Sequence, residues 1–562
     1  MEKSAVLHIG NSNFAYPNNE HELFIRIRTK KGDKFEKIEL YYNFCHFFYL
    51  KSKIKKLDYE FSDELFDYYS TKIITDDQRI SYVFKFTTDK EELFYSEDGF
   101  NENFNQKESY KICFRFAYVN KSDIIYENTK FQGDVFYQIF PERFAAGNKN
   151  KDYVTREWNS LDLKNNPFLG GDIKGIINKL DYIKDLGIDT IYFTPLTESG
   201  SNHKYDVIDY MKIDKQFGTN KEFKLLVDKA HEKGMKICID LVFNHIGYNN
   251  KIFQDVVKKG KKSKYANWFF IDGEQPVQKP LNYKAFADFY GMPKLDTNNP
   301  EVMDYMIKVG KFWIEKFGVD AYRLDVANEV AHSAWQAFKK AIIKSDPKVI
   351  LIGECWHNSA NYLSNAEWES TMNYPFTNAC ENFYVNNTLE PKQFVDKLNG
   401  LLHRYTENNN RMMLNLLDSH DAPRFYTLLN KDKSKYLLAI LTMIFYIGYP
   451  MIYYGNEIFM EGMGDPDNRR AMDWESKEFH TKEHELFKDI VKLRKNDILR
   501  KGDIKIYNEE NLVVIERIIG KNTIKAIINN TEKSITKKYK KVLLQNNFDN
   551  GVFKPYSFIV VN

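Results

Sequence analysis

The sequence predicts an α/β protein: a (β/α)8 TIM barrel with an N-terminal β-sandwich domain, a small excursion domain after strand 3 and a C-terminal β-domain. Two observations predict the barrel. Short apolar runs typical of buried strands alternate with longer segments whose apolar residues recur at helical spacing. Such alternation favours parallel strands joined by helices. A third observation, period-two alternation of apolar residues near both ends, predicts the flanking β-domains.

The changes of pattern along the chain give the expected domain boundaries. We expect the N-terminal β-sandwich over 1–125, the barrel over 126–498 and the C-terminal β-domain over 499–562. Residues 246–298 are too many for a simple connection after the third strand, so we expect a small excursion domain over the barrel mouth. Near the N-terminus, residues 21–42 alternate around a "KKGDK" turn, a pattern that predicts a β-hairpin.

The barrel elements can be placed along the chain. The expected strands are 134–141, 188–195, 236–245, 319–327, 348–356, 370–374, 412–421 and 450–458. The expected helices between them are 172–187, 221–234, 302–318, 334–347 and 391–407. Residues 436–454 form the most apolar stretch, but a Gly and a Pro interrupt it. We therefore interpret it as a buried helix that runs into a buried strand rather than a membrane span.

Composition excludes several classes of function. The chain has 81 basic and 78 acidic residues and a net charge of +3, which gives no argument for a nucleic-acid or membrane partner. Its five cysteines are scattered without a CxxC, so neither a disulfide framework nor a zinc site is expected. The N-terminus has no long apolar run, and we expect a cytoplasmic protein.

Polar residues end four of the expected barrel strands. Barrel enzymes carry their chemistry at the C-terminal ends of the strands. The residues found there are Asp240, Asn244 and His245 (third strand), Arg323 and Asp325 (fourth), Glu354 and Trp356 (fifth), and His420 and Asp421 (seventh). One charged residue at a strand end is commonplace, but acids and histidines on four strands favour a common site. Asp240 can also be only a structural hydrogen-bond acceptor.

Arg323 and Asp325 are two residues apart on an apolar strand, so both side chains lie on the same face. Buried charge is costly unless it is paired or used. We expect Arg323 to hold Asp325 ionised, and the apolar neighbours of Glu354 to raise its pKa. Glycoside hydrolysis needs two such carboxyl groups, one ionised and one that can donate a proton. A two-metal hydrolase would need a denser histidine cluster, and the sequence has no HxH among these residues.

Four segments in this order resemble the signature regions of the α-amylase family, glycoside hydrolase family 13. They are "DLVFNH", "GVDAYRLDVANEV", "GECW" and "LLDSHD". The segment "MPKLD" at 292–296 resembles the signature of the neopullulanase and cyclomaltodextrinase subgroup, with Asp296 in place of the usual Asn. The resemblance covers nearly the whole chain, and the ordered set is far more specific than any one motif.

The resemblance implies roles for individual residues. It implies Asp325 as the nucleophile, Glu354 as the general acid/base and Asp421 as a third acid that grips and distorts the sugar. It also implies these substrate-binding residues: Tyr205, His245, Arg323, Trp356, His420, Asp465 and Arg469.

Several of these residues have simpler interpretations. Tyr205 can be ordinary packing, His245 a core histidine, and Asp465 with Arg469 a surface ion pair. The aromatic residues of the excursion segment can either shape the cleft or form the core of that domain. They are Phe286, Phe289 and Tyr290.

Many relatives bind calcium in a loop after the first strand. The matching candidate ligands here are Asn148, Asp152, the Gly170 carbonyl and Asp172, which supply the oxygen atoms that calcium prefers. Ala146 and Lys151, however, stand where relatives often place oxygen ligands. Loss of calcium, or its replacement by the Lys151 ammonium, is therefore an equal alternative. No cofactor is expected for the chemistry itself.

The resemblance implies a retaining α-glucan hydrolase that cleaves α-1,4-glucosidic bonds in cyclomaltodextrins, maltooligosaccharides and pullulan. An α-glucosidase or a transglycosylase with the same residues is an alternative. A non-catalytic sugar-binding barrel is disfavoured, because all three acids are present. The resemblance also implies a homodimer, in which the N-terminal domain of one subunit lies beside the active site of the other.

Overall fold

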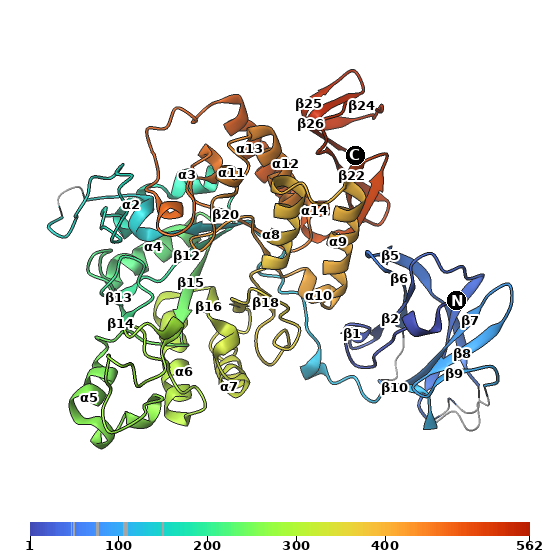
Figure 1. The fold of residues 1–562 in the computed structure, drawn as a ribbon, viewed down its shortest axis with the longest axis horizontal. Helices are drawn as coiled ribbons and strands as arrows, with labels where there is room; N and C mark the ends of the chain where they lie inside the picture. The colour runs from blue at the N-terminus through green and yellow to red at the C-terminus, as the bar shows by residue number, and fades with distance from the viewer. Residues whose placement is uncertain (47, 49–50, 75–77, 105–110, 149–150) are drawn as a thin grey trace. The chain divides into compact units, whose positions relative to one another are not determined.

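The computed structural model describes residues 1–562 except 47, 49–50, 75–77, 105–110 and 149–150. The described residues form two compact units (Figure 1). The N-terminal unit comprises 1–127, 389–410 and 506–508, and the barrel unit comprises 128–388, 411–505 and 509–562. Among the described helices, none combines the length and the apolar character needed to cross a bilayer.

The N-terminal unit is a β-sandwich. Its elements are η1 (Lys3–Ala5), β1 (Ala15–Asn19), β2 (Glu22–Lys30), β3 (Lys37–Phe44), β4 (Lys53–Lys56), β5 (Asp58–Ser62), β6 (Phe66–Ile74), β7 (Ile80–Thr87), β8 (Glu92–Ser96), β9 (Gly99–Asn101), β10 (Phe114–Phe116), η3 (Lys121–Asp123), α9 (Pro391–His403) and α10 (Glu407–Asn410). One sheet has the order β1-β2-β6-β5, and the other has the order β4-β3-β7-β8-β9 with β10 on β7. Ile25, Leu40 and Phe84 share one core between the sheets, which confirms the predicted sandwich.

The predicted hairpin over 21–42 is wrong. Both strands form, but β2 pairs with β1 and β6, whereas β3 pairs with β4 and β7. The "KKGDK" connection therefore crosses from one sheet to the other. Ile27 of β2 and Ile38 of β3 lie in the same core, so the two strands bury their apolar faces against each other across the sandwich instead of pairing edge to edge.

The barrel unit contains the predicted parallel barrel. Its strands are β11 (Phe136–Ile139), β12 (Thr190–Phe193), β15 (Lys236–Val242), β16 (Ala321–Asp325), β17 (Ile350–Gly353), β18 (Ser370–Thr371), β19 (Leu414–Asn415) and β20 (Tyr449–Tyr453). In the described part of the chain they form an eight-stranded sheet of order β18-β17-β16-β15-β12-β11-β20-β19. A parallel bridge between Met372 and Leu414 joins its two ends. The expected strand segments are thus all confirmed.

Helices surround this sheet (Figure 1). They are α1 (Pro141–Phe144), α2 (Ile173–Asn178), α3 (Leu180–Asp185), α4 (Asn220–Glu232), α6 (Pro300–Phe317), α7 (His332–Ile342), α8 (Tyr374–Cys380), α11 (Phe425–Leu428), α12 (Lys433–Phe445), α13 (Lys482–Lys492) and α14 (Asp497–Lys501). Thr219 and Glu222 form a capping box at the start of α4, and Gly318 ends α6 in the left-handed region at φ 75°. The expected helix over 172–187 is two helices, because the backbone leaves helical geometry at Lys179.

The apolar stretch 436–454 is a buried helix followed by a buried strand, as predicted. Every residue of α12 from Tyr436 to Phe445 is buried. This helix contacts β22, β23 and β26 of the C-terminal sheet, so it is apolar on all sides. The C-terminal strands are β21 (Asp503–Glu509), β22 (Leu512–Ile519), β23 (Asn522–Asn529), β24 (Ile535–Thr536), β25 (Val542–Asp549) and β26 (Val552–Val561).

The long segment after β15 forms the predicted excursion. It contains α5 (Lys251–Lys259), η4 (Gly260–Lys262), η5 (Ala266–Trp268) and η6 (Phe286–Asp288). The ring of Phe253 packs at 4.8 Å from Phe269 and 5.1 Å from Tyr283, and these three form its core. Phe289 and Tyr290 are 49% and 43% exposed, so the alternative that they belong to this core is wrong.

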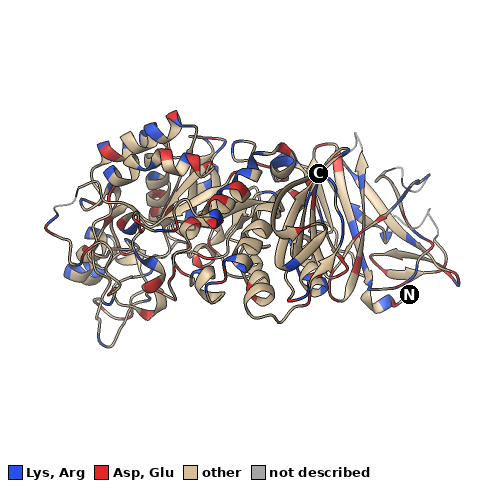
Figure 2. Cartoon of the chain, turned by 90° about the horizontal axis from the view of Figure 1, so that it is seen from above, with Lys and Arg blue, Asp and Glu red and all other residues tan. Residues whose placement is uncertain are grey.

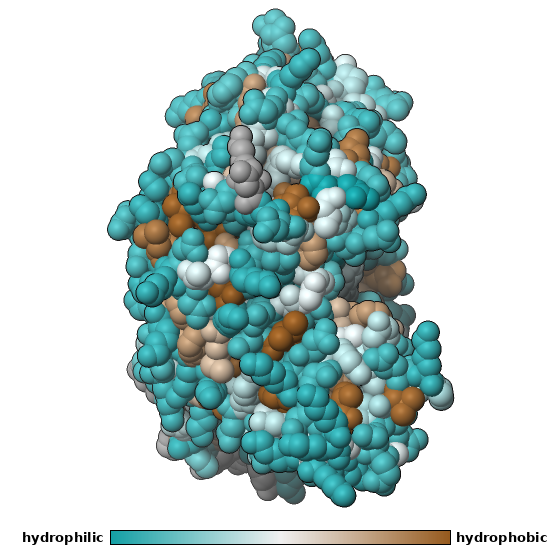
Figure 3. All heavy atoms as spheres, turned by 90° about the vertical axis from the view of Figure 1, so that its left-hand side faces the viewer, coloured by the Kyte–Doolittle hydropathy of each residue, from teal (hydrophilic) through white to brown (hydrophobic). Residues whose placement is uncertain are grey.

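The surface reflects the balanced composition. Basic and acidic residues are interspersed over both units (Figure 2). On the face of the molecule in Figure 3, apolar side chains form small separate groups among polar ones. Isolated apolar groups of this kind are normal for a protein surface. Neither view gives an argument for a strongly charged or broadly apolar partner.

Candidate active site

One buried guanidinium joins the acids of several strands. Arg323 Nη1 lies 2.6 Å from Asp325 Oδ1 and 3.1 Å from each Asp240 oxygen. Its Nη2 lies 2.9 Å from Glu354 Oε2 and 3.9 Å from Asp421 Oδ2. Asp240 and Asp325 belong to β15 and β16, and Glu354 follows β17 directly. The structure therefore brings the three predicted catalytic acids to one place, at the C-terminal ends of the strands.

Burial dominates the electrostatics of this cluster. It raises the pKa of Asp325 well above its ordinary value, and Arg323 opposes that rise. For the same reason the pKa of Asp240 rises to about 6. Arg323 thus favours the ionised form of Asp325, as expected, while burial and then the negative charges of Glu354 and Asp240 oppose it.

Glu354 is held by donors from three sides. Its Oε2 accepts the main-chain N–H of Val326 at 2.8 Å in addition to Arg323. Its Oε1 accepts the indole N–H of Trp356 at 3.1 Å. The Trp356 ring is parallel to the Tyr374 ring at 3.8 Å and 46% exposed, so it presents an open aromatic face beside the carboxylate. Such a face suits contact with a sugar ring.

Arg469 holds the segment that carries Asp421. It lies in η10 (Asp467–Arg469), donates from Nε to the His420 carbonyl at 2.8 Å and places Nη2 3.3 Å from Asp421 Oδ1. Its Nη1 lies 2.9 Å from Asp465 Oδ1. Because Arg469 is 7% exposed, the alternative of a surface ion pair does not describe this residue.

Tyr205 and His420 form one hydrogen-bonded unit. Their rings are parallel at 5.5 Å, and the Tyr205 hydroxyl contacts His420 Nε2 and donates to Asp240 Oδ2 at 3.0 Å. Tyr205 lies in the connection between β13 (Thr197–Ser199) and β14 (Val207–Ile213). Because its single proton goes to Asp240, His420 is the donor in their contact. Burial lowers the pKa of His420 well below its ordinary value and keeps it neutral.

Sequence reasoning missed Gln138, which belongs to this unit. Its side-chain Nε2 lies 2.9 Å from His420 Nδ1. Since Nε2 of His420 carries the proton, Gln138 donates to Nδ1. A signal existed in the sequence, because Gln138 is a polar residue within the apolar run of the first strand. Tyr374, which stacks on Trp356, carried no comparable signal.

His245 is buried but incompletely bonded. Its Nδ1 lies 3.2 Å from the Asn244 amide, its ring is 5.1 Å from Phe286, and its Nε2 has no hydrogen-bond partner among the described residues. Burial, with the Lys294 charge, lowers its pKa to about 3. The contacts described do not join His245 directly to the Arg323 cluster.

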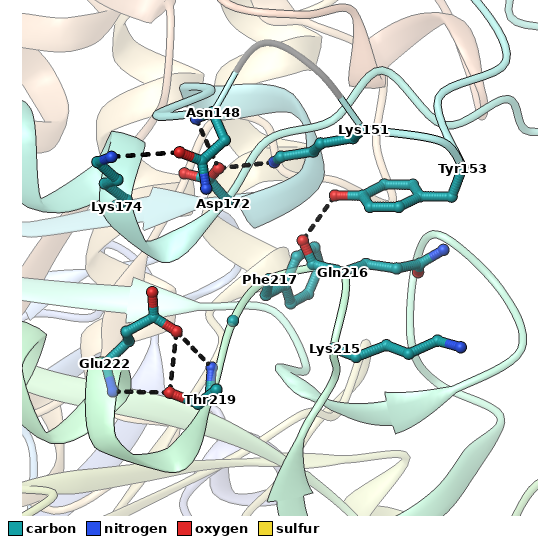
Figure 4. Close-up of a pocket in the computed structure, with 11 residues that line it drawn as sticks. Asn148, Lys151, Tyr153, Asp172, Lys174, Lys215, Gln216, Phe217, Thr219 and Glu222 are labelled. Atoms are coloured by element: carbon teal, nitrogen blue, oxygen red, sulfur yellow. Dashed lines mark hydrogen bonds and ion pairs between the residues drawn. The ribbon is translucent and has the colours of Figure 1, made fainter.

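The proposed calcium ligands do not fit a calcium ion (Figure 4). The Lys151 ammonium lies 2.6 Å from Asp172 Oδ2 and 2.5 Å from the Gly170 carbonyl, so it holds the two oxygens that a metal would need. The Asn148 side-chain oxygen accepts from Lys174, and Asp152 is exposed. Within the described residues, no group of three or more His, Cys, Asp or Glu side chains is arranged to hold a metal.

The fold and the site define a class of protein. A barrel whose strand ends bring together two carboxyl groups, a third acid and an exposed aromatic ring is suited to glycoside hydrolysis. The comparisons agree with this class. The chain belongs to the α-amylase family: residues 138–504 match the model described as "Alpha amylase, catalytic domain", and residues 1–120 match "Alpha amylase, N-terminal ig-like domain".

Individual relatives match nearly the whole chain. "Neopullulanase 2" of Thermoactinomyces vulgaris is 37% identical over an alignment of 563 positions, which covers 97% of this chain and 93% of the relative. "Intracellular maltogenic amylase" of Bacillus subtilis is 37% identical over 514 residues, covering 90% and 86%. A solved structure named "Cyclomaltodextrinase" has a TM-score of 0.92 at 32% identity and covers all of both chains.

Proposed function

We propose that this chain is a retaining hydrolase of α-1,4-glucosidic bonds in cyclomaltodextrins, maltooligosaccharides and pullulan. The single observation that carries the proposal is the contact of one guanidinium, that of Arg323, with both Asp325 and Glu354. A shared cation keeps the two carboxyl groups close together, as retention requires. The names of the relatives support α-glucans as the substrate class.

The first half of the reaction forms a covalent intermediate. Protonated Glu354 gives its proton to the glycosidic oxygen, and the bond from this oxygen to the anomeric carbon breaks. Ionised Asp325 attacks that carbon from the opposite side and forms a glycosyl ester. Asp421, which is held by Arg469, grips the sugar at the cleaved linkage.

The second half returns the enzyme to its starting state. Glu354, now ionised, takes a proton from a water molecule, and the resulting hydroxide attacks the anomeric carbon as the bond to Asp325 breaks. Two inversions give net retention. A sugar hydroxyl that replaces water would give a transglycosylation product instead, so both outcomes use one intermediate.

The first prediction concerns the product. Incubation with β-cyclodextrin, pullulan and starch in parallel should release short maltooligosaccharides fastest from the cyclodextrin. Proton NMR of the initial product should show the α-anomer, because the substrate linkage is α and the reaction retains it. An initial β-anomer would contradict the proposal. Products longer than the substrate at high substrate concentration would favour the transglycosylase, and release of glucose alone would favour the α-glucosidase.

We infer a cytoplasmic homodimer for this chain. The name "Intracellular maltogenic amylase" of one relative supports the location. The dimer rests on family analogy. A single monomeric peak in size-exclusion chromatography at micromolar concentration would contradict it.

We also propose that the Lys151 ammonium takes the place of a calcium ion. Asp172 is 3% exposed and accepts the main-chain N–H groups of Gly147 and Gly175 at 2.8 and 2.6 Å. The Lys151 side chain is only 9% exposed, so this ion pair is well shielded from water. A lysine that supplies the counter-charge leaves no requirement for a divalent cation.

The second prediction tests this cation. The melting temperature of the native protein should not change with EDTA or with millimolar calcium. Lys151→Asn should lower the free energy of unfolding by about 1–3 kcal/mol, because buried Asp172 loses its counter-charge, and calcium should restore part of that loss. Lys174→Asn is the matched control, since Lys174 is exposed and contacts Asn148 rather than Asp172. A native protein that EDTA destabilises would contradict the proposal.

A further inference from the structure

Val326, directly after Asp325, has a backbone conformation that its side chain disfavours. Its φ and ψ are both 44°, in the left-handed region. A β-branched residue rarely occurs there, because its Cβ substituents crowd the backbone. Strained residues of this kind persist only where the surroundings hold them, and they concentrate at functional sites. The strained conformation of Val326 therefore indicates that this turn has a functional role.

The turn ends the hydrogen-bonded ladder between β16 and β17. Leu324 pairs with Gly353, and the Glu354 N–H donates to the Leu324 carbonyl at 2.9 Å. In a parallel ladder the next donor on β16 toward the same neighbour is the N–H of Val326, two residues on. That N–H does not continue the ladder. It donates to the Glu354 side chain, Oε2, at 2.8 Å.

The turn itself is anchored from both sides. The Val326 carbonyl accepts the Glu329 N–H at 3.1 Å, which begins η7 (Ala327–Glu329). The Ala327 carbonyl accepts the indole N–H of buried Trp335 at 2.8 Å. These bonds draw the chain away from the sheet immediately after Asp325. The Val326 N–H is thereby left open to a side-chain acceptor.

We propose that Val326 is a positioning residue. Its left-handed conformation directs its own main-chain N–H, which would otherwise continue the ladder, to the Glu354 carboxylate. A main-chain donor cannot change rotamer, so it fixes Glu354 relative to the adjacent Asp325 more firmly than a side chain would. The inference rests on the proposed function, in which Glu354 is the general acid/base. It concerns the N–H of residue 326 and not the valine side chain.

The direct test removes this one N–H. Incorporation of α-hydroxyisovaleric acid at position 326 by nonsense suppression replaces the amide by an ester and keeps the side chain. We expect kcat on β-cyclodextrin to fall about 10- to 100-fold with little change in KM, because a bond to an ionised group is lost. The alkaline limb of the pH–rate profile should move up by about one pH unit, since ionised Glu354 loses a donor.

The same hydroxy acid at position 330 is a matched control. The Val330 N–H donates to the Ala327 carbonyl at 3.4 Å in the same turn, whereas the Val326 N–H donates to Glu354. This ester should lower the melting temperature slightly and leave kcat and the pH–rate profile unchanged. If both esters changed kcat equally, or if the ester at 326 changed only the melting temperature, the positioning role would be disproved.

A second pair of variants tests the strain. Val326→Gly and Val326→Ala both delete most of the side chain, but only glycine adopts the left-handed region without cost. We expect the glycine variant to melt a few degrees above the alanine variant, and both to keep the native alkaline limb because both keep the N–H. A higher melting temperature for Val326→Ala than for Val326→Gly would contradict the left-handed conformation of this turn. Native protein without activity on any α-glucan would instead overturn the proposed function.

Discussion

Asp325→Asn should abolish turnover, with kcat on β-cyclodextrin lowered by about 10⁴-fold or more. The amide oxygen is a poor nucleophile, and no glycosyl ester forms. Glu354 and its three donors remain in place, so the loss is specific to the step that Asp325 performs. Initial rates with active-site titration measure the effect. Substantial residual activity in a preparation free of native enzyme would contradict the assignment of the nucleophile.

The same variant should fold at least as well as the native protein. Burial raises the pKa of Asp325, and the charges of Glu354 and Asp240 add to that rise, so the ionised form is a cost to the fold. A neutral amide removes this cost, while Arg323 keeps its contacts with Asp240 and Glu354. We expect an equal or higher melting temperature by circular dichroism. Asp467→Asn is the control, because it also replaces an acid by its amide and alters a different ion pair, that with Arg470.

The barrel was predictable because its strands are buried on every side. Every residue of β15 after Lys236 is buried and only Asp240 interrupts its apolar run, a pattern typical of a fully covered strand. The hairpin over 21–42 shows the limit of the same method. Alternation reports which face of a strand is buried, and it does not report which neighbour the strand pairs with. β2 and β3 have the predicted pattern and lie in different sheets.

The identities of the site residues were predictable, and their electrostatics were not. The order of motifs along the chain predicts Asp325, Glu354 and Asp421, and the structure brings them around Arg323. The pKa of Asp325 depends first on its burial and then on the acids that share Arg323, and spacing along the chain reveals neither. Asp240 looked like a structural acceptor, and its negative charge contributes to the raised pKa of Asp325.

Two local features required the three-dimensional structure. The sequence left calcium and the Lys151 ammonium as equal alternatives, because it does not show whether the lysine reaches Asp172. The contact of 2.6 Å between Lys151 and Asp172 favours the ammonium. The left-handed turn at Val326 had no signal at all, since glycine and asparagine are the residues that mark such a turn. Propensity fails at this position because tertiary contacts override it.

Arg323→Met should affect both stability and activity. Asp240, Asp325 and Glu354 would lose the buried cation that they share, and an unpaired buried charge costs about 3–5 kcal/mol. Activity should fall by at least 10³-fold, because the two catalytic acids lose the group that sets their separation. Arg323→Lys is the matched variant. Its single ammonium keeps a positive charge but cannot contact all of these carboxylates, so it should recover stability more than activity.

The stability loss of Arg323→Met should depend on pH in a defined direction. Asp325 and Asp240, the latter with a pKa of about 6, hold protons in the folded state at pH values where the unfolded chain has released them. The free energy of unfolding therefore falls as pH rises through this window. Removal of Arg323 raises both pKa values further, so the deficit relative to the native protein should be larger at pH 8 than at pH 5. Urea unfolding at the two pH values measures it. An equal deficit at both would mean that Arg323 acts through packing and not through the charges of these acids.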